Sequence, residues 1–348
     1  MNNEIETGPI RPPSEAESLL LRVTRNCSWN KCKFCGLYKH QRFSTRPIEE
    51  IKSDIDKIAM SRNSLSERIY NADSDSVFLQ DANTMALSYD KLREILIYLR
   101  EKLPDVKRVT SYGRVDSLAK FSAGQFAGLR EAGLDRIHSG YESGSDKVLT
   151  LINKGHSKEQ EIEAGRKVKS SGIELSVYFM PGVGGRELSD ENAIETADVV
   201  SKTNPDFVRI RTFVSQPGTE LMEDIESGLI TECSDMEKML ELKKMIENIN
   251  GADGRLYSDH IINLHEDVRG DLAEDKEKML AVFEAFEKLD SRRQKRYQLA
   301  RRMGMVRSLS QMGRLSGEYL NRIDMYLDQI GDDGEFDNIL LQFLRRYI

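Results

Sequence analysis

The sequence predicts an α/β fold in which helices cover a parallel sheet. Six strand-like runs alternate with helix-like segments up to residue 221, and this alternation is typical of parallel sheets with helices outside. Polar or glycine-rich segments follow several of these strands, at the place where ligands bind in such sheets. After Pro217-Gly218 the strands give way to long charged segments with helical periodicity, which predicts a different, mainly helical part.

The first strand is expected at 18–24, a short apolar run that includes the β-branched residues Val23 and Thr24. Short runs of this kind, bounded by polar or turn residues, are typical of buried strands. The remaining strands are expected at 76–79, 106–112, 134–141, 173–179 and 207–213.

The first helix is expected to begin at Pro47, because Ile51, Ile55 and Ile58 follow at helical spacing and acidic residues occupy the first turn. A second pattern at 89–103 places leucines on one face. Further helices are expected at 122–132, which ends before Gly133, at 158–171, which ends before Gly172, and at 190–203.

Four polar or glycine-rich segments are expected at one rim of this sheet. They are 27–35, 81–83, 142–144 and 182–185. The carboxyl ends of parallel strands meet at the same edge, so residues far apart in sequence are predicted to share one site there.

Three parts of the chain are predicted. Residues 1–17 are polar and contain three prolines, which indicates a flexible N-terminal tail. Residues 18–221 form the α/β part. Residues 222–348 are expected to be a mainly helical C-terminal extension, with helices at 235–249 and 275–289 and a short strand at 259–264.

The composition is that of a charged globular protein, with a net charge of −7. This charge argues against a generally basic, nucleic-acid-coating surface. No apolar run approaches the roughly 20 residues that span a bilayer, and the polar N-terminus lacks a signal-peptide pattern, so no membrane association and a cytoplasmic location are expected. Four cysteines, three of them clustered, do not form a disulfide framework.

A local basic segment nevertheless occurs at 291–314, with eight basic and no acidic residues. One interpretation is a solvated face that balances the acidic segments beside it. The other is a surface that contacts RNA or an anionic substrate. The basic residues are Arg292, Arg293, Lys295, Arg296, Arg301, Arg302, Arg307 and Arg314.

Cys27, Cys32 and Cys35 lie within nine residues, in the spacing C-x4-C-x2-C directly after the first strand. A four-iron cluster normally takes four cysteines, so three would leave one iron open to a ligand that is not protein. Such a ligand could chelate the iron through an amine and a carboxylate. The alternative is structural zinc, with His40 as a fourth ligand.

In these residues the chain resembles a radical S-adenosylmethionine (radical SAM) enzyme, whose usual motif is C-x3-C-x2-C with an aromatic residue before the last cysteine. Phe34 holds that aromatic place, and one additional residue lies between Cys27 and Cys32. The stretch 141–149, YESGSDKVL, is similar to the E-S-G-S-x-x-V-L signature of the branches around coproporphyrinogen dehydrogenase, Elongator-type and methylthiotransferase enzymes. The resemblance implies a partial (β/α)6 barrel.

The resemblance also implies the cofactors and the residues that hold them. Cys27, Cys32 and Cys35 would bind a [4Fe-4S] cluster. Phe34 would pack beside the adenine of S-adenosylmethionine.

Five polar residues take places where the family contacts the rest of that cofactor. Asp81 and Asn83 stand where the methionyl amino group binds, although ordinary turn chemistry is the alternative. Glu142 would accept hydrogen bonds from the ribose, and Lys154 would pair with the methionyl carboxylate, the alternative being a surface ion pair. Ser176 would also reach the ribose.

The activity implied by the resemblance is reductive cleavage of S-adenosylmethionine to a 5′-deoxyadenosyl radical, which takes a hydrogen atom from a substrate. The reaction class would be oxidoreductase or transferase, and the electron donor a flavodoxin or ferredoxin. Arg209 and Arg211 share a strand face. They would favour an anionic substrate if they face the interior, or pair with acidic helices if they point outward. The alternative function is a zinc-stapled, non-catalytic protein whose extension binds RNA or a protein.

Overall fold

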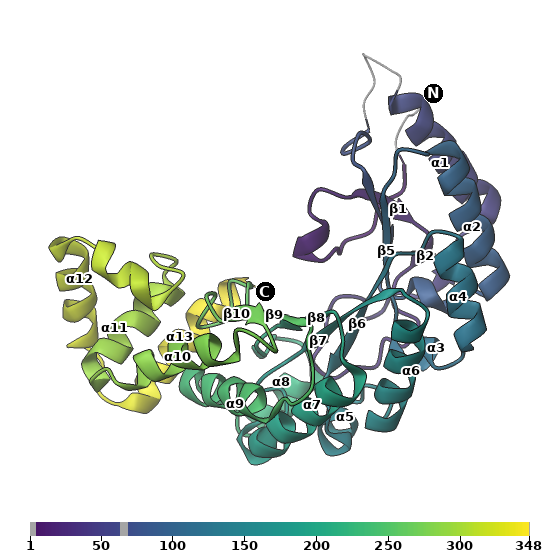
Figure 1. Ribbon diagram of the computed structural model, residues 1–348. Coiled ribbons are helices and arrows are strands. Elements are labelled where there is room, and N and C mark those ends of the chain that lie inside the picture. The colour runs from purple at the N-terminus through teal and green to yellow at the C-terminus, as the bar shows by residue number, and fades with distance from the viewer. Residues whose placement is uncertain (1–4, 63–68, 348) are drawn as a thin grey trace. The chain divides into compact units, whose positions relative to one another are not determined.

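A computed structural model describes residues 5–62 and 69–347 (Figure 1). Its main sheet has the strand order β1-β4-β5-β6-β7-β8-β9-β10. Parallel pairing joins β1 to β4, β4 to β5, β5 to β6 and β8 to β9, and β10 is antiparallel to β9. The predicted α/β fold with a mainly parallel sheet is confirmed. The strands are β1 (Leu19–Arg22), β4 (Ser76–Gln80), β5 (Arg108–Tyr112), β6 (Arg136–Glu142), β7 (Glu174–Phe179), β8 (Phe207–Ile210), β9 (Arg255–Tyr257) and β10 (Arg269–Asp271).

Helices follow the strands of this sheet in the predicted alternation. Those expected at 89–103, 122–132, 158–171 and 190–203 agree with the structure to within two residues. The helices of this part are α1 (Ile48–Arg62), α2 (Tyr89–Lys102), α3 (Val115–Leu118), α4 (Ala123–Glu131), α5 (Asp146–Leu151), α6 (Lys158–Ser170), α7 (Ser189–Thr203) and α8 (Glu220–Glu226). Short 3-10 helices are η1 (Pro13–Glu15), η2 (Thr84–Ala86) and η3 (Arg186–Leu188), and β2 (Thr24–Arg25) pairs with β3 (Ser44–Thr45).

The C-terminal part is mainly helical, as predicted. It contains α9 (Asp235–Asn248), α10 (Lys276–Glu287), α11 (Ser291–Arg302), η4 (Leu309–Arg314), α12 (Gly317–Leu327), α13 (Asp333–Leu344) and η5 (Arg345–Tyr347). None of the helices within residues 5–62 and 69–347 is long and apolar enough to cross a membrane.

The strand predicted at 259–264 is wrong. The strand lies earlier, as β9, and residues 258–265 form turns in which the Asn263 N–H donates to the His260 carbonyl at 3.0 Å. The sixth predicted strand also ends early, at Ile210. Beyond Ile210, the backbone N–H of Thr212 donates to the side-chain oxygen of Asn263 at 3.0 Å. A side chain therefore replaces a neighbouring strand as the acceptor there.

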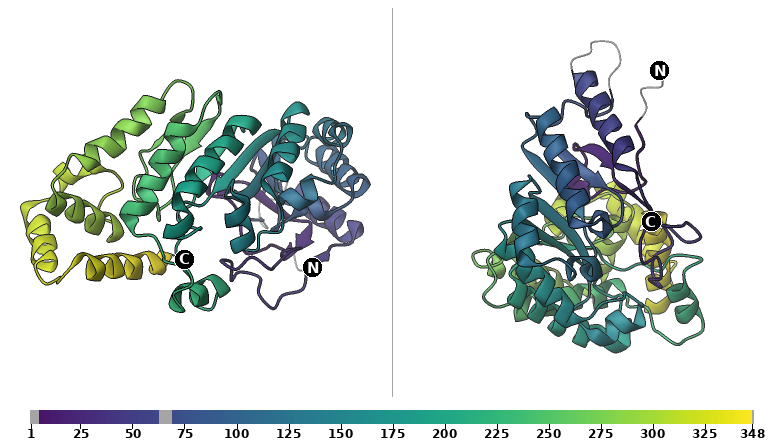
Figure 2. Two further views of the ribbon diagram at one scale, coloured as in Figure 1. Left: turned by 90° about the horizontal axis from the view of Figure 1, so that it is seen from below. Right: turned by 90° about the vertical axis from the view of Figure 1, so that its right-hand side faces the viewer.

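The chain divides into two compact units. The first contains residues 1–31, 37–141 and 159–177, and the second contains 32–36, 142–158 and 178–348. In the first unit α1, α2 and α4 lie on one side of the strands (Figure 1), and every residue of β4 is buried. In the second unit α7 and α9 pack side by side, as the teal and green helices of Figure 2 show. The predicted boundary at residue 221 stays a prediction.

Residues 5–17 make specific contacts with the first unit, although the sequence indicated a flexible tail. The side chain of Gln80, at the end of β4, donates to the carbonyls of Gly8 and Ile10 at 2.8 Å. Glu15 is fully buried and accepts hydrogen bonds from Ser18 at 2.5 Å and from His138 at 3.1 Å. These long-range partners anchor the segment, and a sequence pattern does not reveal them.

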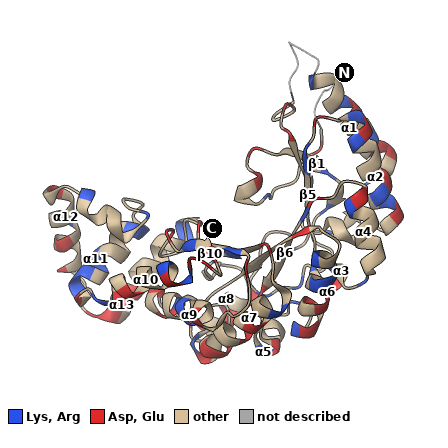
Figure 3. Ribbon diagram, viewed as in Figure 1, with Lys and Arg blue, Asp and Glu red and all other residues tan. Residues whose placement is uncertain are grey.

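The basic segment 291–314 lies beside acidic residues of the neighbouring helices (Figure 3), and most of its basic side chains pair with carboxylates. Arg296 pairs with Asp324 of α12, and Lys295 pairs with Asp333 of α13 at 2.5 Å. Arg302 forms a buried bidentate pair with Asp235 of α9, at 2.7 and 2.6 Å. Arg292, Arg293 and Arg301 also pair with carboxylates, those of Asp328, Asp290 and Glu266. The structure therefore favours the interpretation as a charge-balanced face.

Candidate cofactor site

The chain on the N-terminal side of Cys27 is held by Asp81, which follows β4. The carboxylate of Asp81 is fully buried. Its Oδ2 accepts hydrogen bonds from the backbone N–H of Asn26 at 3.0 Å and from the guanidinium of Arg22 at 2.7 and 3.1 Å. Charge-assisted hydrogen bonds of this kind are the stronger ones. Asp81 thus fixes the backbone directly before the first cysteine of the motif.

The other oxygen of Asp81 accepts a short hydrogen bond from the hydroxyl of Tyr38, beyond the last cysteine of the motif, and one from the Ala82 N–H at 2.8 Å. Burial, together with the hydrogen bond to Asp81, raises the pKa of Tyr38 far above its ordinary value, so the hydroxyl keeps its proton and remains the donor. With two donors on Oδ1 and three on Oδ2, the carboxylate has used its acceptor capacity.

Asn83 holds the residue on the other side of Cys27. Its amide nitrogen donates to the hydroxyls of Ser28 and Ser117, both at 2.8 Å, and its oxygen accepts from the Arg114 N–H at 3.0 Å. Both amide hydrogens are therefore used. The two residues expected at the methionyl amino group also bind Asn26 and Ser28, the two neighbours of Cys27.

Asparagines shape the loop that carries the cysteines. Asn26 and Asn30 adopt φ angles of 67° and 52°, in the left-handed region that asparagine tolerates better than most residues. The Asn30 side chain donates to the Tyr38 carbonyl at 2.5 Å, and its backbone N–H donates to Cys27 Sγ at 3.4 Å. Tyr38 and these asparagines were missed from sequence; the repeated asparagine in a short polar loop was the available signal.

Cys32 to Gly36 belong to the second unit and are held there by the backbone of Lys33. Its N–H donates to the Ile152 carbonyl after α5 at 2.9 Å, and its carbonyl accepts from the Leu221 N–H of α8 at 3.0 Å. The ammonium of Lys33 pairs with Asp224 at 2.7 Å. Three predicted site residues come together beside this anchor.

Phe34, Glu142 and Lys154 are those three residues. Phe34 packs on an apolar cluster that includes Ile152 and Leu221, and the Lys154 ammonium lies 5.7 Å from the centre of its ring. Lys154 also pairs with Glu142 at 2.8 Å, and its side chain is only 7% exposed. The charged pair is therefore nearly buried, which argues against an ordinary surface ion pair. Glu142 has a φ of 70°, a strained value that is common at functional sites.

The E-S-G-S stretch, residues 142–145, packs against α7, and this packing explains its small residues. Ser143 donates to Asn192 at 2.5 Å, and the Gly144 N–H donates to the Thr196 hydroxyl at 2.9 Å. A Cβ on Gly144 would lie 2.4 Å from the backbone oxygen of Glu195, so only glycine fits. Ser145 caps α5 by accepting from the Val148 N–H at 3.3 Å. This contact with α7 places Glu142 at the end of β6.

A buried carboxylate that the sequence did not reveal supports the glycine-rich turn 182–185. Glu241 of α9 accepts from the Gly182 N–H at 2.9 Å and from the Asn192 amide at 2.6 Å. Its complete burial outweighs these hydrogen bonds and raises its pKa to about 7. The turn is therefore held by protein contacts.

Ser176 and the three cysteines are the remaining predicted site residues. Ser176 is fully buried on β7. Cys32 is buried, Cys27 and Cys35 are partly exposed, and none of the three forms a disulfide. Within residues 5–62 and 69–347, no group of three or more His, Cys, Asp or Glu side chains is arranged to hold a metal ion. Cys233 is a separate buried thiol whose pKa burial raises to about 12, so it remains protonated and unreactive.

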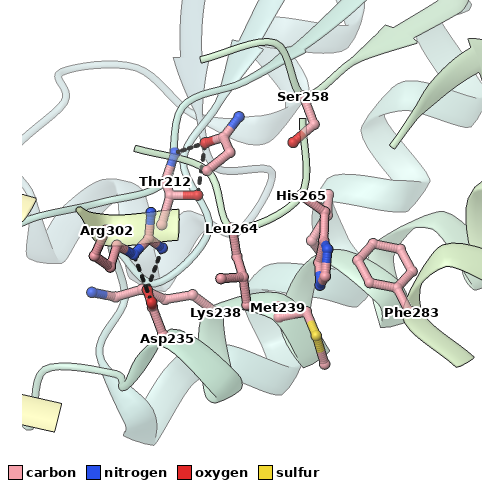
Figure 4. A pocket seen from close by; sticks show the side chains of 11 residues that line it. Thr212, Asp235, Lys238, Met239, Ser258, Leu264, His265, Phe283 and Arg302 are labelled. Atoms are coloured by element: carbon pink, nitrogen blue, oxygen red, sulfur yellow. Dashed lines mark hydrogen bonds and ion pairs between the residues drawn. The ribbon is translucent and has the colours of Figure 1, made fainter. Parts of the chain in front are cut away.

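A polar pocket lies in the second unit and is lined by Arg302, Asp235, Thr212 and His265, among others (Figure 4). Burial lowers the pKa of His265 to about 3, which keeps the imidazole neutral at physiological pH. Its ring stacks on Tyr297 at 5.2 Å. The aromatic packing and the bidentate ion pair give this pocket a structural role.

A comparison with known families matches residues 21–197, just over half of the chain, to the Radical SAM superfamily. The chain belongs to the radical SAM superfamily. Radical SAM enzymes use a [4Fe-4S] cluster and S-adenosylmethionine, so these are its cofactors, and the family favours the iron–sulfur interpretation of the three cysteines over structural zinc.

Relatives of this radical SAM chain include two synthases. The tRNA-2-methylthio-N(6)-dimethylallyladenosine synthase of Prosthecochloris aestuarii is 20% identical over 272 residues, covering 74% of the chain and 56% of the relative. The 4′-phospho-dehydrooxetanocin synthase of Priestia megaterium is 27% identical over 251 residues, covering 66% and 30%. Among solved structures, coproporphyrinogen III oxidase from Escherichia coli has a TM-score of 0.49 at 17% identity, covering 66% of this chain and 51% of that one. The radical SAM chain spans about half or less of the length of these relatives.

Proposed function

We propose that this chain cleaves S-adenosylmethionine reductively and uses the resulting radical to take a hydrogen atom from a substrate. A reduced cluster held by Cys27, Cys32 and Cys35 would supply the one electron that reductive cleavage of S-adenosylmethionine requires. The protein binds and orients the reactants and excludes water from the site. The reaction class would be oxidoreductase or transferase.

Cys27, Cys32 and Cys35 would hold the cluster. The observation that carries this proposal is the number of separate contacts that fix the three-cysteine loop: Asp81 and Asn83 bind the residues beside Cys27, and Ile152 and Leu221 bind Lys33. Each of these two anchored segments loses less conformational entropy when its thiolates take up a metal centre. Thiolates are the ligands that such clusters require.

Phe34, Glu142 and Lys154 would bind the S-adenosylmethionine. Phe34 offers an apolar ring to the adenine. Lys154 is a nearly buried cation that would pair with the methionyl carboxylate, and Glu142 would then be released to accept hydrogen bonds from the ribose hydroxyls, which Ser176 would also approach. Asp81 and Asn83 would also position Cys27, and the Asn83 side-chain oxygen, which accepts from the Arg114 N–H, would use its second lone pair to accept from the methionyl amino group.

The electron donor would be a flavodoxin or ferredoxin, and a cytoplasmic location would keep the thiols reduced. A relative that modifies tRNA supports RNA as a substrate class, and the segment 291–314 would be the surface that contacts it. Six of the eight basic side chains of that segment pair with carboxylates, which reduces the positive charge offered to a phosphate backbone. The observations therefore favour a substrate bound elsewhere.

The proposal is tested by anaerobic purification and cluster reconstitution. We expect about four irons per chain and formation of 5′-deoxyadenosine when dithionite and S-adenosylmethionine are added. Cys32→Ala should lose both iron and product. Cys233→Ala is the matched control, because Cys233 is equally buried but lies outside the motif, and it should retain both.

Two results would contradict the proposal. One is a wild-type protein that holds a single zinc and no iron. The other is a reconstituted wild-type protein that makes no more 5′-deoxyadenosine than Cys32→Ala does.

A further inference from the structure

Two arginines lie at the carboxyl end of β8, where ligands of parallel sheets bind. Arg209 is on the strand, and Arg211 follows its last residue. Val208 and Ile210, which alternate with them, are fully buried apolar residues. The arginines therefore share the opposite face of the strand, and both are largely buried, with side chains 6% and 13% exposed.

Each guanidinium lies over aromatic rings of the second unit. Arg209 is 5.6 Å from the ring centre of Phe207 and 5.3 Å from that of Tyr257, and Arg211 is 5.2 Å from that of Tyr178. Rings at this distance attract a cation and hold its plane in a fixed orientation. The ring contacts leave the edges of the guanidinium groups to other partners.

The two cations share one carboxylate. Asp259 Oδ2 lies 3.5 Å from Arg209, and Asp259 Oδ1 lies 3.2 Å from Arg211. The neighbouring His260 adds no charge at pH 7, because burial and the charge of Arg211 lower its pKa to about 4. The four side chains together therefore carry one positive charge in a largely buried place, where charges interact strongly.

Arg211 has a buried donor that this arrangement does not use. Its Nη1 donates to the Ile210 carbonyl at 2.8 Å and to Asp259, but within residues 5–62 and 69–347 its Nη2 has no hydrogen-bond acceptor. The fully buried Arg302, by contrast, has acceptors on all three nitrogens, from Asp235 and Ile262. A buried donor without an acceptor is costly and needs an explanation.

We propose that Arg209 and Arg211 form a subsite for an oxyanion group of the substrate, a carboxylate or a phosphate. This inference rests on the proposed function and names the substrate class for it. An oxyanion would accept from Arg211 Nη2 and neutralise the excess positive charge, and a planar guanidinium suits either group. Asp259 occupies the neighbouring edges and would compete with the incoming anion.

The test measures thermal unfolding of the anaerobic holoenzyme in increasing inorganic phosphate, and separately in acetate, with chloride holding the ionic strength constant. A ligand that binds the folded state raises the melting temperature with concentration. We expect at least one of the two anions to raise it above chloride. Arg211→Gln should raise the apparent dissociation constant for the anion by about tenfold or more, the loss expected for a hydrogen bond to a charged group. Asp259→Asn should lower it.

Arg292→Gln is the matched control, because Arg292 also pairs with an aspartate but is 48% exposed, and it should bind as the wild type does. If neither anion differs from chloride, or if Arg292→Gln and Arg211→Gln weaken binding equally, the subsite is refuted. Should Arg211→Gln fail to fold, Asp259→Asn decides, since unchanged or weaker binding would refute the proposal. Product formation by the wild type separates the two proposals: 5′-deoxyadenosine without an anion effect refutes the subsite alone.

Discussion

Single side chains of the first unit decide how the first cysteine is held. Asp81 connects Asn26, before the motif, with Tyr38, after it, and Asn83 connects to Ser28. A carboxylate that is fully buried and bound by a guanidinium and three further donors is strongly fixed. The polar loop after β4 therefore serves the cluster site by shaping the neighbouring loop.

Asp81→Asn should disturb this arrangement without changing the size of the side chain. An amide nitrogen cannot accept from Arg22 or Asn26, so we expect a loss of roughly 3 kcal/mol in the free energy of unfolding, measured by urea denaturation. In the apo protein, Cys27 should also be alkylated faster, which mass spectrometry would detect. Asp116→Asn is the control, because Asp116 pairs with Arg114 and is 27% exposed. Equal alkylation of Cys27 in the two variants would refute the positioning role.

Glu15 makes the anchoring of the N-terminal segment dependent on pH. Burial alone would raise its pKa, but hydrogen bonds from His138 and Ser18 and the nearby charges lower it below the ordinary glutamate value. A lowered pKa stabilises the folded state at pH values above the unfolded pKa, and this stabilisation is lost as the pH falls through the folded pKa. Glu15→Gln should therefore cost about 1–3 kcal/mol at pH 7 and clearly less near pH 3. Urea unfolding of both proteins at the two pH values measures this difference, and a constant difference would contradict it.

At the scale of elements, α7 holds the segment that follows β6, and α9 holds the turn that follows β7. The backbone of Gly144 is pressed against α7, and the turn after β7 is hydrogen-bonded to Glu241 of α9. The contact with α7 fixes the segment from Glu142 to Ser145, which carries one of the proposed cofactor ligands. The signature that resembles other enzymes is thus also a packing motif.

Gly144→Ala should show the packing requirement directly. Its Cβ would lie 2.4 Å from a backbone oxygen, which cannot move without displacing α7, so we expect a loss of roughly 1–3 kcal/mol. Gly124→Ala is the control, since its Cβ would meet only the Ser122 hydroxyl at 3.9 Å and alanine favours a helix. Thermal unfolding of both variants measures the difference. A Gly144→Ala protein as stable as Gly124→Ala would contradict the packing argument.

At the scale of the whole molecule, charges are balanced within the C-terminal helices. The cations of α11 pair with acidic groups of α12, α13 and the loop at Glu266, and Arg302 forms a buried pair with α9. Arg209 and Arg211, at the carboxyl end of β8, are both paired with Asp259. The arginines at the end of β8, rather than the basic segment 291–314, are therefore the candidates for binding an anion.

The sequence predicted the strands β1 and β4 to β8 and the helices α1, α2, α4, α6, α7, α9 and α10, together with the resemblance that the spaced cysteines carry; it did not place α3, α5, α8 or α11 to α13. Such features depend on hydrophobic periodicity and on residues close together in the chain. The strand expected at 259–264 failed because β9 formed a few residues earlier, where it pairs with β8, and local apolar content does not specify a pairing partner.

The tertiary structure alone decided what the polar residues bind. Asp81 and Asn83, which are expected at a cofactor, also bind Asn26 and Ser28, each 55 residues away in sequence. Glu15 and His138 are 123 residues apart. A buried polar group must find a partner, but which partner it finds depends on how distant segments pack, and no local pattern encodes that.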